Sequence, residues 1–237
     1  RFASKLGFEI ETKTAVAMHE KKELLKEISA ERIFSELKLI LCGKDATKVL
    51  LDFSDIIGQI IPEIKPTIGF EQHNKHHVYD VYTHTAVAVG SIDPDPTLRL
   101  TMLLHDIGKP DVYHFEDGQG HFYGHGKAGA ALAQAMLTRR LRLPTQTCQR
   151  VVLLVERHDV PLTPTPKAVR RTLAALGPQA ASQLAAVHLA DLQAHHLTGR
   201  NGERLRGFLA ETREFAALLE EETRRGACVS LKDLAVN

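Results

Sequence analysis

The sequence predicts a mainly α-helical protein. Hydrophobic residues make up 43% of the 237 residues, but aromatic residues make up only 5% and Trp is absent, so the core must be built from Leu, Ala, Val and Ile. This composition favours helices over a β-sandwich. Apolar residues also recur at helical spacing along most of the chain. We therefore expect packed helices with one short β-hairpin.

The first part of the chain is expected to form helices followed by a linker. Residues 1–41 are predicted to form two helices and their joint, because apolar side chains such as Ile33 and Leu37 recur at helical spacing. Residues 44–57 form the next predicted helix. Proline and glycine punctuate residues 61–70, which indicates a linker and a domain boundary there.

The rest of the chain is expected to alternate helices with short turns. Asp95 and Pro96 supply an N-cap and a proline at the first helical position, and Gly108 ends the same helix. Asp117-Gly118 lies between two short aromatic-containing runs and predicts the hairpin over 112–123. Helices are expected at residues 78–91, 97–107, 125–141, 144–158, 166–176, 179–197 and 202–224.

Charge, cysteines and the chain ends limit location and partners. A net charge of +1 does not by itself predict a nucleic-acid-binding surface. Cys42, Cys148 and Cys228 are widely spaced and form no metal-binding or redox motif, which indicates a reducing compartment. No apolar run is long enough to span a membrane, and no signal peptide is found. Both ends look cut, so we expect a cytoplasmic fragment of a longer protein.

Adjacent His105 and Asp106 are the first candidates for a metal site. They end a strongly apolar helix, where burial without a partner would cost several kcal/mol and a metal would supply the partner. Imidazole and carboxylate together suit Mg, Mn, Ni, Fe or Zn, and such a site usually hydrolyses its substrate. The alternative is a helix end in contact with water.

Two further candidate ligands lie on apolar helix faces. His84 lies on such a face, where a histidine is more often a core residue than a ligand. Asp191 occupies a position that should face the core, and buried carboxylates are rare unless paired or metal-bound. The alternative for Asp191 is a pair with His188 or His195, one helical turn away. Apart from that pairing, His195 is assigned to the surface or to the surroundings of the site.

Other polar residues are assigned to a second metal, to phosphate and to RNA. His125 and His158 lie at helix ends, where they are candidate ligands of a second ion or else helix caps in contact with solvent. Lys109 is expected to contact a phosphate oxygen, the alternative being a solvated lysine. Basic clusters that could follow an RNA backbone, or form solvated faces, contain Arg139, Arg140, Arg142, Arg170 and Arg171.

Several short motifs carry a family resemblance. They are RFASKLGFEIE at 1–11, SAERI with EL at 29–37, HVYDVYTHT at 77–85, LHDIGKP at 104–110, FYGH at 122–125 and SLKDLAVN at 230–237. The first two resemble the RNA-binding neck, and the others the HD domain and tail, of bacterial CCA-adding tRNA nucleotidyltransferases and their poly(A) polymerase relatives. The resemblance implies an RNA-binding neck at 1–60, an HD-type helical domain at 61–200, and a C-terminal helix with a truncated tail at 201–237.

The resemblance implies a role for the intact protein in tRNA 3′-end processing. The catalytic head, which would use ATP and CTP, would lie upstream of Arg1, so this chain alone is expected to add no nucleotide. We expect the HD domain to act as a metal-dependent 2′,3′-cyclic phosphodiesterase or phosphatase. The expected partner is the 3′ end of tRNA or another RNA, with no DNA and no membrane.

The expected site has two ions. His84, His105, Asp106 and Asp191 would hold the first, and His125 and His158 with a bridging Asp106 the second, with His105, Asp106 and Lys109 as the catalytic residues. The divalent metal would be Mg, Mn, Ni or Fe. The alternatives are a free-standing HD nucleotidase and a non-catalytic tRNA-binding module whose HD site is structural.

Overall fold

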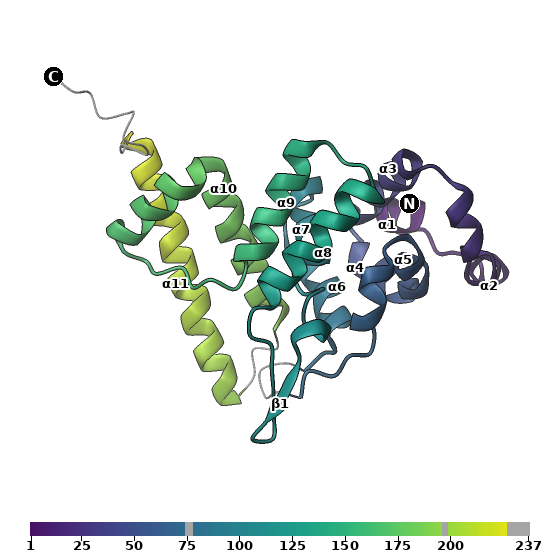
Figure 1. Ribbon diagram of the computed structural model, residues 1–237, viewed down its shortest axis with the longest axis horizontal. Coiled ribbons are helices and arrows are strands. Elements are labelled where there is room, and N and C mark those ends of the chain that lie inside the picture. Colours follow the sequence, from purple (N-terminus) through teal and green to yellow (C-terminus); the bar gives the residue numbers. More distant parts are fainter. Residues whose placement is uncertain (74–77, 196–198, 227–237) are drawn as a thin grey trace.

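The computed structural model describes residues 1–73, 78–195 and 199–226. These residues form an elongated helical molecule, with the N-terminal helices at one end and α10 and α11 at the other (Figure 1). The prediction of a mainly α fold with a short β-hairpin is confirmed. Within the described residues, no helix is both long and apolar enough to cross a membrane. The motif at 230–237 lies outside them.

The N-terminal part is more divided than the sequence predicted. The prediction of two helices over 1–41 is wrong, because Gly7, with φ at 74°, ends a separate first helix. The single helix predicted at 44–57 is also wrong, since the backbone of Phe53 (φ −123°, ψ 34°) leaves the helical region. The elements are α1 (Phe2–Leu6), α2 (Thr12–Glu20), the 3₁₀ helix η1 (Lys22–Glu27), α3 (Ala30–Leu41), α4 (Ala46–Asp52) and α5 (Ser54–Ile60).

The remaining elements follow the predicted order. Residues 61–70, expected as a linker, contain a 3₁₀ helix, and Gly177 (φ 74°, ψ 164°) kinks α10 between the two helices predicted there. The antiparallel hairpin closes at Asp117-Gly118, as predicted. These elements are η2 (Pro62–Thr67), α6 (Val81–Ser91), α7 (Pro96–Leu104), η3 (Pro110–Val112), β1 (His114–Glu116), β2 (Gln119–His121), α8 (His125–Arg139), α9 (Thr145–Arg157), α10 (Pro166–Ala194) and α11 (Gly199–Arg224).

Aspartate caps fix the starts of the two central helices. The Asp95 carboxylate accepts hydrogen bonds from the backbone N–H groups of the first turn of α7, which confirms the predicted N-cap. Asp80 caps α6 in the same way, so that helix begins at Val81 and not at residue 78. The two caps set the start of each helix, and α6 and α7 carry or lead into three of the predicted metal ligands.

One continuous apolar cluster holds most of the molecule together. It joins Leu37 and Leu50 of the N-terminal helices to Leu103 of α7, Val151 of α9 and Val187 of α10. Apolar packing thus crosses the predicted domain boundary between residues 60 and 61. That boundary stays a prediction. A smaller cluster attaches α11 to both parts of α10 and contains Val169, Leu173, Ala181, Ala185, Phe215 and Leu219.

Gly108 allows α8 to approach the turn that follows α7. A Cβ atom added at Gly108 would lie 2.4 Å from the amide nitrogen of Gly129 and 2.4 Å from the carbonyl oxygen of His125. Because both neighbours are backbone atoms of one helix, the contact could be relieved only by moving α8. The absence of a side chain at Gly108 thus brings His125 close to His105 and Asp106.

We predict that Gly108→Ala destabilises the fold by about 1–3 kcal/mol, the usual cost of overpacking, in urea unfolding. Gly207→Ala is the control, because nothing lies within 4 Å of the added Cβ on helix α11. That variant should keep its stability or gain up to about 1 kcal/mol from helix propensity. Equal unfolding midpoints for the two variants would contradict the close approach of α8.

Candidate metal centre

Six side chains of the types that bind metals, from five segments of the chain, lie close together. His84 comes from α6, His105 and Asp106 directly follow α7, and the others come from the start of α8, the end of α9 and the end of α10. We call these residues the histidine–aspartate cluster: His84, His105, Asp106, His125, His158 and Asp191. The structure thus brings together all six predicted ligands, and four of them are at least 97% buried.

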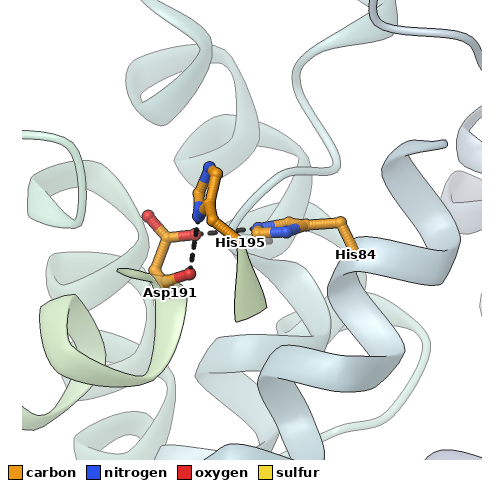
Figure 2. Close-up of side chains that lie close together, drawn as sticks. All are labelled: His84, Asp191 and His195. Atoms are coloured by element: carbon orange, nitrogen blue, oxygen red, sulfur yellow. Dashed lines mark hydrogen bonds and ion pairs between the residues drawn. The ribbon is translucent and has the colours of Figure 1, made fainter. Parts of the chain in front are cut away.

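Asp191 joins the first half of the cluster. Its Oδ1 lies 2.8 Å from His84 Nε2 (Figure 2) and 3.6 Å from His105 Nε2. His105 Nε2 also lies 3.2 Å from Asp106 Oδ2. His195 donates its Nδ1–H to the backbone carbonyl of Asp191 at 2.8 Å. It also forms a possible ligand group with His84 and the Asp191 carboxylate, so the structure places this histidine, assigned from the sequence to the surface or the surroundings of the site, beside the cluster.

Asp106 links this half to a second group of imidazoles. Its Oδ1 lies 3.5 Å from His125 Nε2 and 3.6 Å from His158 Nε2, while its Oδ2 faces His105. The two Nε2 atoms of His125 and His158 are 3.0 Å apart. One carboxylate thus presents one oxygen to each half, which is the geometry of a bridging ligand.

Backbone carbonyls fix the tautomers of three imidazoles. His105, His125 and His158 each donate Nδ1–H to the carbonyl three residues earlier, at 2.7–2.8 Å. In a neutral ring this leaves the Nε2 lone pair free to act as a ligand, and such a hydrogen bond is typical of metal-bound histidine. All three Nε2 atoms point into the cluster.

The resulting arrangement fits a divalent metal. Two lone pairs 3.0 Å apart, on His125 and His158, repel each other unless a cation or a proton lies between them. His105 Nε2 is buried and has no aligned hydrogen-bond partner within the described residues. Buried polar atoms almost always have a bonding partner, and a metal ion would provide one for His105 Nε2. Nitrogen and carboxylate oxygen donors suit Mn, Fe, Ni or Zn.

The charges of the cluster also favour a cation. Burial raises the pKa of Asp106, but the charges of His105 and Lys109 outweigh it and hold the pKa well below its usual range. Burial lowers the pKa of His105, but Asp106 and Asp191 outweigh it and raise the pKa to about 10. Without a metal, therefore, a proton on His105 neutralises part of the buried negative charge.

Lys109 is held beside the cluster. Its Nζ lies 2.8 Å from Asp106 Oδ2, donates to Gln72 Oε1 at 2.9 Å, and sits 5.3 Å from the centre of the Phe122 ring. Sequence reasoning missed Gln72, because nothing in its spacing connects it to Lys109. Lys109 also lines an open cavity of about 360 Å³ that reaches Asp106, His125, His158 and Asp191.

The arginines predicted to bind RNA belong to other surfaces. Arg139 ends α8, and because a helix rises about 1.5 Å per residue it lies on the order of 20 Å from His125. Arg140 forms an ion pair with Glu63 at 3.2 Å. Arg142 is exposed in the turn after α8, and the exposed Arg170 and Arg171 lie in the first part of α10. None of the five lines the cavity at the cluster.

Comparisons with known proteins match the chain in two parts. Residues 7–68 match the family described as the probable RNA and SrmB-binding site of polymerase A, and residues 74–231 match the HD domain. The motifs at 29–37, 77–85, 104–110 and 122–125 fall within these ranges, and those at 1–11 and 230–237 overlap them in part. The RNA-binding match is the shorter of the two and covers α2 to η2.

Similar curated proteins are tRNA nucleotidyltransferases. The A-adding tRNA nucleotidyltransferase of Deinococcus radiodurans is 31% identical over 99% of this chain and 57% of its own length. The CC-adding enzyme of Thermus thermophilus is 34% identical over 72% of this chain and 42% of its own length. The multifunctional CCA protein of Legionella pneumophila is 29% identical over 67% of this chain and 40% of its own length. The chain spans about half the length of these relatives.

We predict that binding of Mn²⁺ releases a proton near pH 8, because the proton on His105, with its pKa raised to about 10, must leave before Nε2 can bind a metal. Below that pKa protons compete with the ion, so the affinity should rise with pH by roughly tenfold per unit. Calorimetric titration in buffers of different ionisation enthalpy measures both effects. Binding that releases no proton, with a Kd that does not change with pH, would contradict a metal bound at His105 Nε2. The control is His114→Ala, which removes an exposed histidine of the hairpin and should bind Mn²⁺ as wild type does.

Proposed function

The chain belongs to the HD-domain family, and we propose that its histidine–aspartate cluster is a metal-dependent phosphohydrolase centre in a protein of tRNA 3′-end processing. The observation that carries the proposal is the Nε2–Nε2 distance of 3.0 Å between His125 and His158, both of which donate Nδ1–H to a carbonyl. Two lone pairs held face to face beside Asp106 are arranged for a cation.

The ligands divide into two sets. We assign His84, His105, Asp106 and Asp191 to one ion, and His125 and His158, with Asp106 shared, to a second. Possible ligand groups in the structure are His84 with His105 and Asp106, Asp106 with His125 and His158, and His84 with Asp191 and His195. Of the expected metals, Mn, Ni and Fe suit these imidazole and carboxylate donors better than Mg, which prefers oxygen ligands. A divalent ion bound here would supply a Lewis acid and would lower the pKa of its bound water towards neutrality, which is what phosphoester hydrolysis needs at neutral pH.

Lys109 contributes a fixed positive charge. Its Nζ is held by Asp106 and Gln72, and the residue is among those that line the cavity at the cluster. The ammonium group is therefore already fixed close to the place where a phosphate in this cavity would bind. Such preorganised charge stabilises a transition state more than a mobile surface lysine does. We therefore assign Lys109 to the phosphate.

We also propose that the parent protein modifies the 3′ end of tRNA in the cytoplasm. The RNA-binding match at 7–68 and the names of the relatives support this. ATP and CTP would belong to the transferase reaction of the whole protein. RNA contacts remain a prediction for Arg139, Arg140, Arg142, Arg170 and Arg171.

A second candidate function is a non-catalytic RNA-binding module with a structural cluster. The observation that favours it is that partners are already present for both carboxylates. Lys109 Nζ lies 2.8 Å from Asp106, and His84 Nε2 lies 2.8 Å from Asp191. In this case the chain would bind RNA but would not turn over any phosphoester.

We predict that the chain, with added Mn²⁺ or Ni²⁺, hydrolyses 2′,3′-cyclic AMP and that Asp106→Ala abolishes this activity, because the change removes a ligand of both ions. Released 2′- or 3′-AMP, separated by chromatography, is the readout. His114→Ala is the matched control and should keep full activity, because this exposed histidine lies outside the cluster. Equal rates for wild type and Asp106→Ala would show that the activity comes from another site or a contaminant.

A further inference from the structure

Gln72 is a buried polar side chain that lies outside the histidine–aspartate cluster and contacts its neighbour Lys109. Its exposed fraction is 1%, and its Oε1 accepts a hydrogen bond from Lys109 Nζ at 2.9 Å. Its Nε2 donates to the backbone carbonyl of Tyr79 at 3.1 Å. Because a carbonyl can only accept and an ammonium group can only donate, these two partners fix which way the amide points. Lys109 therefore meets the amide oxygen.

The backbone around Gln72 is held by two neighbouring elements. The carbonyl of Phe70 accepts a hydrogen bond from the N–H of Val81, the first residue of α6, at 3.1 Å. The carbonyl of His73 accepts one from the N–H of Gly120 in β2 at 2.9 Å. A Cβ atom added at Gly120 would lie only 2.3 Å from the carbonyl oxygen of Gln72. The position of Gln72 is thus set by α6 and by the hairpin.

The ammonium group of Lys109 has one charged and one neutral acceptor. Its Nζ lies 2.8 Å from Asp106 Oδ2 and 2.9 Å from Gln72 Oε1, and it has no third acceptor among the described residues. An ammonium group carries three N–H donors, so one donor remains. Lys109 is only 5% exposed and lines the cavity at the cluster. The remaining donor is available to an anion in that cavity.

The neutrality of Gln72 matters because the cluster already contains two carboxylates. A further carboxylate in its place would also hold the ammonium group, but its negative charge would cancel the charge that attracts a phosphate. An amide oxygen fixes the ammonium group by a charge-assisted hydrogen bond and leaves the net charge unchanged. If Asp106 Oδ2 is a metal ligand, Gln72 is the acceptor that still holds Lys109.

We propose that Gln72 is a positioning residue for phosphate. Its neutral amide oxygen holds Lys109 at the cavity, so that the third N–H of the ammonium group donates to a phosphate oxygen. Gln72 itself does not touch the phosphate and acts only through Lys109. The proposal rests on the proposed function, because it takes the cavity at the cluster as the phosphate site.

A double-mutant cycle tests whether Gln72 acts through Lys109. Titration calorimetry of the Mn²⁺-loaded protein measures the Kd of inorganic phosphate for wild type, Gln72→Met, Lys109→Met and the double variant. Gln72→Met keeps the length of the side chain and loses the acceptor, so it should weaken phosphate binding by about threefold to tenfold, the value of a typical hydrogen bond. In the Lys109→Met background the same change should have no effect, because residues that act as one unit are not additive.

Two further variants separate this role from packing. Gln119→Met is the matched control, because Gln119 is exposed at the start of β2, and it should bind phosphate as wild type does. Gln72→Glu has nearly the shape of the native side chain and keeps an acceptor for Lys109. It should still bind Mn²⁺ but bind phosphate more weakly than wild type, because the new carboxylate neutralises the ammonium group. This variant also decides the matter if Gln72→Met does not fold.

The proposal would be overturned by an equal loss on Gln72→Met in both backgrounds, by no loss in either, or by Gln72→Glu binding phosphate as tightly as wild type. Wild type that binds Mn²⁺ but no phosphate would also overturn it. Phosphate binding needs no turnover, so coupling between Gln72 and Lys109 without hydrolysis of 2′,3′-cyclic AMP would support the positioning role and reject the phosphohydrolase. Hydrolysis that depends on Asp106, with additive effects at Gln72 and Lys109, would do the opposite.

Discussion

The negative charge of two neighbouring carboxylates, the buried Asp106 and the partly exposed Asp191, is the constraint on which the rest of this structure depends. Carboxylates removed from water are costly unless cations compensate them. Lys109 supplies one positive charge at 2.8 Å, and the imidazoles of the cluster surround the remaining oxygens. A divalent ion would meet the need more fully than a proton on His105, because it accepts several lone pairs at once.

The fold meets this constraint by bringing helix ends together. His105 and His158 directly follow α7 and α9, so the carbonyls of the last helical turn can orient each ring. His125 begins α8, and the carbonyl of Phe122, just before that helix, orients its ring. Gly108 lets α8 approach the turn after α7, and the continuous apolar cluster also contains residues of α6 and α10, which carry His84 and Asp191. The same carbonyl contacts that fix the rings also leave their Nε2 atoms facing one another.

The sequence predicted the parts of this site whose residue types conflict with their surroundings. A carboxylate on the apolar face of α10 and a His-Asp pair at the end of an apolar helix stand out without a structure. The bounds of the N-terminal helices were harder to predict, because a single residue such as Gly7 or Phe53 ends a helix without changing the spacing of the apolar residues around it. Gln72 carries no local signal, since only tertiary packing brings it to Lys109.

The central claim is that the cluster is built around metal ions with Asp106 between them. Anomalous diffraction from crystals soaked in Mn²⁺ tests it most directly, because the positions of bound ions are seen independently of activity. The account predicts anomalous peaks between Asp106 and the Nε2 atoms of His105, His125 and His158. Crystals that show no peak there at saturating Mn²⁺, with the imidazoles unmoved, would contradict it.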